Sequence, residues 1–399
     1  MSRPLPNLPP PGPPVPPAGG STGPLPRRTT VAVLGGGVAA LAVGARLAEA
    51  STDVVIMHRG AFFGDGIGRR DAGRVAAGLA EHPHRLVAAV GLQPASEIYR
   101  FTDENRALLH AGGWLHTAFG LNAAFDAEES DEVAAASAAL EAMGRGASPQ
   151  PARDVDAALG GRGFGPGRID PTEAQVRPRD VLQALWDRAK DAGAQLVTNA
   201  QVTGLRDTVD GTRVVLTQGE LAADVIVLAD GWRTRDVDPW FADKVHPVRV
   251  HYRRYAPAGG PATPGFSAQQ GWFFGGRDAE DGLIVSGARW ATPHLEVLES
   301  DDTIVQEHVD TALGGLVERR LPRWATAGLT HRWSAIAAAT CDQLPIIGPL
   351  PGRANIVACC GWNGRPWSLA MRAAQAVSDG LLGLPSPAIP RLFSARRLM

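Results

Sequence analysis

Three consecutive glycines, residues 35–37, are the feature of this chain best suited to holding a reactive group. They follow the apolar, β-branched run 31–34 and precede an alanine- and leucine-rich stretch, residues 38–48. With Ala40 they give the spacing G-x-G-x-x-A, in which Gly35 permits a tight turn and Gly37 lets a phosphate approach the backbone. The helix that follows would offer unpaired N–H groups. We therefore predict a dinucleotide site; the alternative is a glycine-rich turn in a domain without cofactor.

The residues after the second predicted strand, 53–57, depart from the usual dinucleotide pattern. A carboxylate normally stands there and accepts the ribose hydroxyls, whereas this chain has His58 and Arg59. A neutral His58 imidazole can still hydrogen-bond a ribose, and Arg59 could meet a 2′-phosphate, as in NADP. These residues alone leave FAD, NAD and NADP open.

Length and composition limit the classes of protein. The 399 residues suit a two-domain enzyme with a large core. The net charge of −2 gives no basic field, so we expect no nucleic-acid partner. We find no apolar run of about 18 residues, so no membrane span is expected. The three cysteines follow neither zinc nor disulfide spacing, and the start of the chain lacks a signal-peptide pattern, so we expect a cytoplasmic protein.

Two stretches carry weaker signals. Residues 1–28 are proline-rich and should form a disordered tail, with a PxxP ligand segment as the alternative. In the glycine- and arginine-rich segment 61–79, Arg69 and Arg70 could neutralise phosphate, unless the segment is a solvated basic loop.

The histidines His82 and His84 form an HPH motif. The sequence offers no acidic or cysteine partner at ligand spacing, so we expect a loop or capping role and no metal site.

Hydrophobic periodicity places the elements that must position these residues. Helices are predicted over residues 94–113, 123–143, 179–193, 304–319 and 366–382. Strands are predicted over residues 195–197, 202–205, 212–217, 225–228, 247–255, 271–274, 282–288, 333–339 and 355–360. The four strands between 195 and 228 end in the turn 229–231 and predict a β-meander that rejoins the first sheet.

Four segments, in order, resemble motifs of the FAD-dependent D-amino acid oxidase superfamily, which includes glycine oxidases and monomeric sarcosine oxidases. They are VAVLGGGVAALAVGARL, the segment ending VIVLADGW, TCDQLPIIGPLPG and IVACCGWNGRPWSLA. GIGRRDAG is similar to the family's SGRNAG segment beside the flavin phosphates. The resemblance extends over most of residues 29–395 and favours FAD over NADP.

The resemblance implies an α/β fold with a Rossmann-like FAD-binding domain of the glutathione-reductase type and a second, antiparallel-sheet α+β substrate domain. We assign residues 29–90, 165–238 and 334–399 to the FAD-binding domain. Residues 91–164 and 239–333 then form the substrate-binding domain. The residues expected to contact FAD are Gly35, Gly37, Val38, Ala39, Ala40, His58, Arg59, Arg69, Arg70, Asp71, Val202, Ala229, Gly231, Trp232, Asp342, Gly361, Trp362, Asn363 and Gly364.

Two departures from the family bear on the reaction. Ala335 stands where sarcosine oxidases have the cysteine that bonds FAD, so we predict non-covalent FAD. Ala337 stands where glycine oxidases have the arginine that binds the substrate carboxylate, which argues against a simple free α-amino acid. Arg289 and Arg365 are candidates to replace that arginine; the alternative for each is a structural ion pair.

The oxygen-activating lysine of sarcosine oxidases also has no obvious counterpart. A gapless alignment puts His294 there, and a charged histidine could serve the same purpose. Trp333, with Trp290, Trp362 and Trp367, could line an aromatic substrate pocket, or could belong to ordinary packing. Arg289, His294, Arg365 and Trp333 are therefore the candidate catalytic residues.

By this resemblance the chain is expected to oxidise a C–N bond of an amine or amino-acid-derived substrate to an imine, by hydride transfer to flavin N5, in specialised metabolism. The partners would be that small molecule and O2 or another electron acceptor. One alternative is a flavin monooxygenase using NAD(P)H, because residues 229–231 are similar to the ADG motif of aromatic hydroxylases, although their GDAAH segment is missing. The other is a non-catalytic flavin-fold binding subunit.

Overall fold

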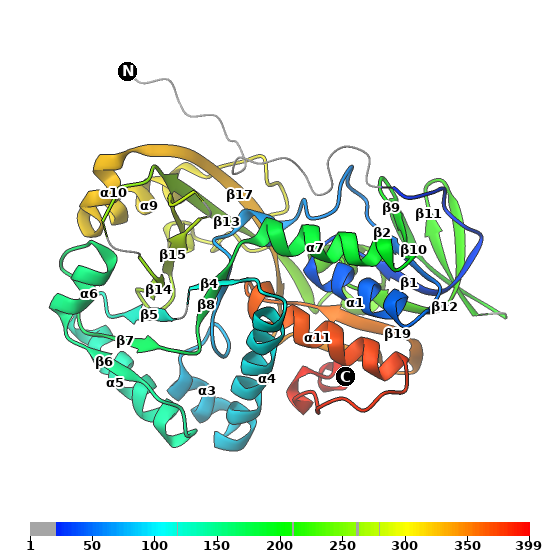
Figure 1. Ribbon diagram of the computed structural model, residues 1–399, viewed down its shortest axis with the longest axis horizontal. Helices are drawn as coiled ribbons and strands as arrows, with labels where there is room; N and C mark the ends of the chain where they lie inside the picture. The colour runs from blue at the N-terminus through cyan, green and yellow to red at the C-terminus, as the bar shows by residue number, and fades with distance from the viewer. Residues whose placement is uncertain (1–20, 118, 210, 261–262, 279) are drawn as a thin grey trace. The chain divides into compact units, whose positions relative to one another are not determined.

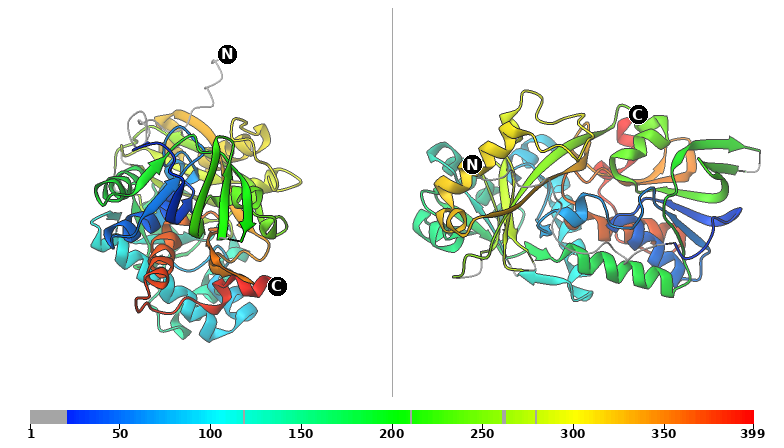
Figure 2. Two further views of the ribbon diagram at one scale, coloured as in Figure 1. Left: turned by 90° about the vertical axis from the view of Figure 1, so that its right-hand side faces the viewer. Right: turned by 90° about the horizontal axis from the view of Figure 1, so that it is seen from above.

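The structure, a computed structural model, describes residues 21–117, 119–209, 211–260, 263–278 and 280–399 (Figures 1 and 2). Within these ranges the chain divides into two compact units. Unit 1 comprises residues 70–177 and 248–336, and unit 2 comprises residues up to 69 together with 178–247 and 337–399. No helix in the described ranges is long and apolar enough to cross a lipid bilayer.

Unit 2 is an α/β unit. Its strands are β1 (Arg28–Leu34), β2 (Val54–Met57), β9 (Gln195–Val197), β10 (Val202–Thr208), β11 (Gly211–Leu216), β12 (Gly219–Leu228), β18 (Ile346–Leu350) and β19 (Arg353–Cys360). Its helices are α1 (Val38–Glu49), α7 (Pro178–Asp191), α8 (Thr234–Val237) and α11 (Pro366–Leu381). Short 3-10 turns are η1 (Gly231–Arg233), η2 (Pro239–Phe241), η4 (Arg391–Phe393) and η5 (Ala395–Leu398).

The sheet of unit 2 has a parallel centre. Strands β9, β2, β1, β12 and β19 are parallel neighbours in that order, with Val33 facing both Ile56 of β2 and Val227 of β12. Strands β10 and β11 extend from β12 as an antiparallel meander, and β18 pairs antiparallel with β19. The predicted βαβ unit is thus confirmed, and the meander is confirmed for β10, β11 and β12. Strand β9, predicted as its first strand, instead pairs parallel with β2. Strand β18 was not predicted, because proline and glycine interrupt its apolar run and its pairing comes from β19.

Helix α1 packs against α7 and α11 (Figure 1). Its alanines, valines and leucines are buried almost all round, as a helix covered by neighbours on several sides requires. The helix also lies very close to β2, because a Cβ placed on Gly44 would be 2.2 Å from Ile56 Cδ1. This packing fixes where the amino end of α1 stands relative to the strands.

Unit 1 is an α+β unit. Its strands are β3 (Arg74–Val75), β4 (Leu115–Thr117), β5 (Gly120–Ala123), β6 (Ser148–Gln150), β7 (Gly167–Asp170), β8 (Ala174–Val176), β14 (Gly265–Ala268), β15 (Phe273–Arg277) and β16 (Leu283–Gly287). Its helices are α3 (Pro83–Val90), α4 (Leu92–Ala111), α5 (Ala127–Ala142), α6 (Ala152–Leu159), α9 (Glu307–Arg320) and α10 (Pro322–Ala327), with the turn η3 (Arg289–Ala291). Helix α2 (Ile67–Arg70) and strands β13 (Val245–Tyr255) and β17 (Leu329–Thr340) run across the boundaries between the units.

The main sheet of unit 1 has the order β17-β13-β16-β15-β14-β5-β7-β6, and a small sheet has the order β3-β8-β4. The β13–β16, β14–β15, β15–β16, β5–β7 and β6–β7 pairs are antiparallel, and β5–β14 is parallel. An antiparallel-sheet domain is therefore confirmed, with one parallel pair. The predicted helix 123–143 begins only at residue 127, because residues 120–123 pair with β7 and β14, and the Asp126 side chain caps the helix by accepting from Glu129 N.

The two compact units differ from the predicted domains in several segments. Residues 70–90, 165–177 and 334–336, assigned from the sequence to the FAD-binding domain, lie in unit 1, and residues 239–247, assigned to the substrate-binding domain, lie in unit 2. Of the predicted tail, residues 1–20 lie outside the described residues, whereas residues 21–28 are ordered. Thr22 N bonds Leu196 O, and Ser21 Oγ accepts from Thr198 N at 3.0 Å. The free edge of β9 explains this order, because an edge strand offers unpaired backbone groups.

Candidate functional site

The carboxyl ends of the parallel strands in unit 2 bring together segments far apart in the sequence. They are the turns after β1 (35–37), β2 (58–60), β12 (229–231) and β19 (361–364). In open parallel sheets, ligands bind outside this edge. Most of the residues predicted to contact the cofactor therefore lie on one edge of one sheet.

The glycine turn after β1 combines two tight contacts with one open position. Gly35 has a φ of +136°, and a Cβ there would lie 2.4 Å from Ala229 O. A Cβ on Gly36 would lie 2.5 Å from the His58 ring. Gly37 is exposed, has an ordinary φ of −88°, and its Cβ would meet no described atom within 4 Å. The local fold therefore requires Gly35 and Gly36, whereas only an approaching ligand would require glycine at Gly37.

The amino end of α1 begins at this open position. Gly37 is its N-cap, and among the described residues no side chain caps its first N–H groups. Val38, Ala39 and Ala40 are buried and supply the backbone of the first turn. Uncapped N–H groups and the helix dipole favour an anionic ligand, so this end of α1 can hold a pyrophosphate.

His58 is buried at the end of β2 and points toward the glycine turn. Its Nε2 lies 2.8 Å from Asp65 Oδ1, and a Cβ on Gly60 would lie 2.1 Å from Asp65 Oδ2. Asp65, which the sequence analysis missed, therefore places a carboxylate beside the end of β2, where a dinucleotide site has one. Arg59 is exposed.

A second carboxylate, that of Asp230, lies on the other side of the glycine turn, after β12. Burial raises the pKa of Asp230 from 3.8 to about 6, and the neighbouring His58 and Arg59 side chains act against that rise. Asp230 belongs to the ADG motif, so its sequence position was noticed. Its closeness to His58, however, follows from the strand order β12-β1-β2.

The loop between β19 and α11 is held by Asn363. Its Oδ1 accepts from Thr340 N at 2.9 Å, its Nδ2 donates to Gly361 O at 2.9 Å, and its backbone N donates to Ala338 O. Gly361 and Gly364 both have a φ of +78°, and only at Gly361 would a Cβ strike a neighbour, Thr340. These bonds connect the loop to the end of β17.

Helix α11 starts at Pro366, after this loop, and its N-cap residue Arg365 makes no side-chain cap bond. The Trp367 indole donates to Gly68 O at 3.1 Å, which packs the start of α11 against the GIGRR segment. Two predicted contact segments thus meet within unit 2. Trp362 and Arg365 are partly buried beside them.

The Asp342 side chain, predicted to contact the cofactor, is paired with Arg397. Arg397 donates to both of its carboxylate oxygens, at 2.6 and 3.0 Å, and also to Leu344 O and Pro345 O. Burial acts to raise the pKa of Asp342, but the bonds from Arg397 bring it below its ordinary value. The side chain therefore anchors the C-terminal turn η5, and its role as a cofactor contact stays a prediction.

Three further predicted contacts, Arg69, Val202 and Trp232, lie in unit 2. The Arg69 guanidinium lies over the Phe62 ring, and Val202 begins β10. Trp232 packs on the apolar core below the sheet and lies under the Arg233 guanidinium. The roles of these three residues in cofactor binding therefore stay predictions.

Other predicted residues lie in unit 1. Arg70 donates to Asp302 Oδ2 at 2.6 Å and to Ser334 O at 3.2 Å, so it would have to exchange these partners to bind phosphate. The Asp71 side chain accepts from Gly73 N. Trp333 is buried, donates to Arg70 O, and stacks on Tyr252 at 5.3 Å between ring centroids. These contacts favour packing over a substrate-lining role for Trp333.

Arg289 and His294 lie on the segment after β16. The Arg289 guanidinium lies over the Trp272 ring and donates to Leu295 O at 2.9 Å, and burial lowers its pKa. His294 is exposed, and Trp290 is 45% exposed, so this segment carries accessible side chains. Arg289 retains donors for a further acceptor.

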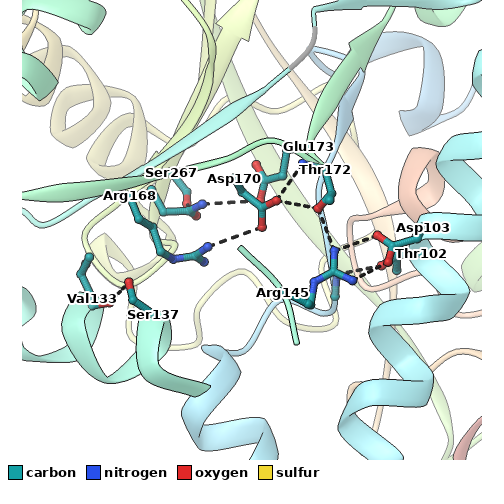
Figure 3. Close-up of polar contacts among 12 residues, drawn as sticks. Thr102, Asp103, Val133, Ser137, Arg145, Arg168, Asp170, Thr172, Glu173 and Ser267 are labelled. Atoms are coloured by element: carbon teal, nitrogen blue, oxygen red, sulfur yellow. Dashed lines mark hydrogen bonds and ion pairs between the residues drawn. The ribbon is translucent and has the colours of Figure 1, made fainter. Parts of the chain in front are cut away.

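Unit 1 also contains a line of paired charges that is separate from these residues. Arg168 lies 3.5 Å from Asp170, which accepts from Thr172 Oγ1, and Arg145 donates to Thr172 and to Asp103 at 2.8 Å (Figure 3). Because these charged groups are paired with one another, we interpret the network as structural.

Comparisons with known proteins agree with this geometry. The family model described as DAO, FAD dependent oxidoreductase, matches residues 30–379. A comparison with curated proteins gave no match. Glycine oxidase from Geobacillus kaustophilus is 21% identical with a TM-score of 0.78, covering 93% of this chain and 99% of its own.

Two further solved structures share the fold. L-proline dehydrogenase from P. horikoshii is 15% identical with a TM-score of 0.79, covering 94% of this chain and 98% of its own. NikD, an amino acid oxidase essential for nikkomycin biosynthesis, is 20% identical with a TM-score of 0.70, covering 92% and 97%.

Proposed function

Because the chain belongs to the D-amino acid oxidase family of FAD-dependent oxidoreductases, whose model matches residues 30–379, we propose that it oxidises the C–N bond of an amine or amino-acid-derived substrate to an imine. FAD, when bound, supplies the acceptor for the hydride. The observation that carries the proposal is the open, uncapped N-terminus of α1 at Gly37, on the edge where the parallel strands end.

The described residues of unit 2 fit FAD. The first turn of α1 would hold the pyrophosphate, and Asp65 with His58 would hold the ribose hydroxyls. The start of α11 and the loop held by Asn363 would present backbone N–H groups to the isoalloxazine, where they favour negative charge. In this proposal unit 2 binds FAD and unit 1 contributes the substrate-binding residues.

The FAD is proposed to be non-covalent. Ala335 offers no nucleophile, and Cys359 and Cys360 are buried in β19, where burial raises the pKa of each thiol. Buried, protonated thiols are poor nucleophiles. Cys341 is exposed, so a Cys341→Ser variant provides the control for any flavin that proves covalent.

The substrate is proposed to be an amine rather than a simple free α-amino acid. Ala337 and Ala338 form a small, buried apolar stretch of β17. By the resemblance to glycine oxidases, Ala337 stands where an arginine would bind the substrate carboxylate. Arg289 is the candidate that could restore a clamp, because its guanidinium keeps donors beyond its bond to Leu295 O. NikD is named for a role in nikkomycin biosynthesis, which supports a place for this fold in specialised metabolism.

Re-oxidation is proposed to be slow with O2. The chain has only two lysines, Lys190 and Lys244. Lys190 lies over the Trp186 ring, and Lys244 pairs with Asp243 at 2.7 Å. His294 is the remaining candidate for a positive charge near developing superoxide. An artificial electron acceptor should therefore support faster turnover than air-saturated buffer.

The test is an absorbance spectrum of the purified protein before and after acid precipitation, followed by anaerobic titration with amines and amino acids. We expect yellow supernatant and bleaching by one class of amine. Flavin in the pellet would contradict non-covalent binding, and a colourless protein would contradict FAD. Flavin bleached only by NAD(P)H would support a monooxygenase, and no bleaching by any reductant of either class would support a binding subunit.

The amine-versus-amino-acid choice has its own test. If Arg289 binds a substrate carboxylate, Arg289→Gln should raise KM roughly tenfold for amino acids and leave neutral amines unchanged, which corresponds to about 1.4 kcal/mol. An equal effect on both classes would mean that Arg289 only supports the segment after β16.

A further inference from the structure

Two histidines and a glutamate meet in unit 1, and none of them is assigned above to the cofactor or the substrate. His82 immediately precedes α3, His84 lies in its first turn, and Glu132 lies on α5, which packs against α3. One possible ligand atom from each residue lies within 4.8 Å of the others. His84 Nε2 and Glu132 Oε2 are 3.0 Å apart, and the two imidazole centroids are 5.7 Å apart. The labels of α3 and α5 in Figure 1 mark this part of the fold.

The sequence around the HPH motif contains no acidic residue at metal-ligand spacing. The tertiary structure provides an acidic partner, Glu132. Glu132 is far from His84 along the chain, so no local spacing could reveal the set. His82 does not act as a side-chain cap of α3 within the described residues. The His82 imidazole therefore does not perform the capping role expected for this motif.

The donor atoms of the cluster suit a metal ion. An imidazole nitrogen and a carboxylate oxygen are both common zinc ligands. His84 Nδ1 is buried without a hydrogen-bond partner in the described chain, which leaves that ring nitrogen unsatisfied.

The spacing is close to that of a real site. Zinc bonds of about 2.0–2.1 Å at tetrahedral angles separate ligand atoms by about 3.3 Å. The 3.0 Å between His84 and Glu132 is near this value, and His82 needs only a short movement to reach it. Three protein ligands with a water would complete the tetrahedron.

We propose that His82, His84 and Glu132 bind one divalent transition-metal ion of the zinc type, which joins α3 to α5. The competing interpretation is a metal-free network in which Arg85 is the only cation on the carboxylate. Arg85 Nη2 lies 2.8 Å from the same Oε2 that His84 approaches. A fixed positive charge there opposes a metal ion. The proposal therefore predicts that zinc binds more tightly when Arg85 is removed, whereas the metal-free network predicts no zinc binding with or without Arg85.

The experiment is isothermal titration of the EDTA-treated, dialysed holoprotein with zinc. We expect one equivalent bound with micromolar or tighter affinity. Loss of one of the three ligands, by His84→Ala or Glu132→Gln, should weaken it by roughly 10- to 100-fold or more. The exposed residues Glu128, on the same helix, and His308 provide matched controls, and Glu128→Gln and His308→Ala should bind zinc as the wild-type protein does.

Arg85→Gln provides the second arm and does not depend on the ligand variants folding. Zinc should bind this variant more tightly than the wild-type protein, because the competing charge is gone. No zinc binding by the wild-type protein, unchanged binding after His84→Ala, or weaker binding after Arg85→Gln would each overturn the proposal. Flavin content, measured by absorbance in every variant, reports whether the rest of the protein is intact.

Discussion

His58 and Asp65 form a contact at the carboxyl end of β2, with 2.8 Å between Nε2 and Oδ1. Asp65 lies on the loop after β2, and the contact holds its carboxylate beside the end of that strand. Dinucleotide-binding sheets usually have a carboxylate at this position. His58 thereby connects the glycine turn, against which its ring packs, to Asp65.

The first prediction concerns Asp65. Asp65→Asn should weaken FAD binding roughly tenfold, about 1.4 kcal/mol, because an amide has one acceptor oxygen where the carboxylate has two. Release of flavin fluorescence on dilution measures the affinity. Asp191→Asn, at an exposed position in α7, is the control and should bind FAD normally. Unchanged affinity in Asp65→Asn would mean that Asp65 only orients His58.

The second prediction compares a glycine that would leave room for a ligand, Gly37, with a glycine required by packing, Gly44. Gly37→Ala should fold normally, because its φ is ordinary and its Cβ meets no described atom, yet it should lower FAD affinity at least about tenfold. Gly44→Ala should instead destabilise the fold by about 1–3 kcal/mol, since its Cβ collides with Ile56. Flavin affinity and denaturant unfolding measure the two effects.

The control for the glycine pair is Gly146→Ala, an exposed position where a Cβ also meets no described atom. It should change neither quantity. If Gly37→Ala binds FAD as tightly as the wild-type protein, the open space at α1 is not the pyrophosphate site.

The third prediction is a pH dependence caused by Asp230. Its pKa is about 6 in the folded protein and 3.8 ordinarily, so the folded state binds more protons than the unfolded state between these values. The free energy of unfolding should therefore fall as pH rises from about 4 to 6 and remain lower above that window. In the cofactor-free protein, Asp230→Asn should raise stability at pH 7.5 by about 1–3 kcal/mol.

Urea unfolding of the wild-type protein and of Asp230→Asn, at pH 4 and pH 7.5, measures this dependence. The gain should nearly vanish at pH 4, where the wild-type carboxyl is largely protonated in the folded protein. A gain of the same size at both pH values would show that burial of the charge is not its cause.

The fourth prediction concerns the C-terminal turn. Arg397→Gln removes the bonds to Asp342 and to two backbone carbonyls, and should cost about 2–3 kcal/mol of unfolding free energy. Because the pKa of Asp342 is lowered in the folded protein, its share of this stability is present above the ordinary value of 3.8 and is lost at lower pH. Arg396→Gln, exposed on the same turn, should stay within about 0.5 kcal/mol of the wild-type protein.

The local elements could be predicted from the sequence because short-range physics specifies them. The run 31–34, the glycines after it and the helix 38–49 follow from β-branching, conformational freedom and apolar periodicity over a few residues. The same patterns led to most of the strands, the meander and the family, since the family motifs are contiguous. Gly35 and Gly37 were assigned for reasons that the backbone geometry supports: a positive φ at one and open space at the other.

The partners of the charged residues were decided by the tertiary structure alone. Asp65 reaches His58 around a loop, Arg397 reaches Asp342 from the last turn of the chain, and Glu132 reaches His84 from another helix. A side chain's charge acts over a few ångströms of space, whatever the separation along the chain, so no spacing rule locates such pairs. The sequence by itself determined the strands, the glycine turn and the family; packing of α1, α3, α5 and the strand order determined which charges face one another.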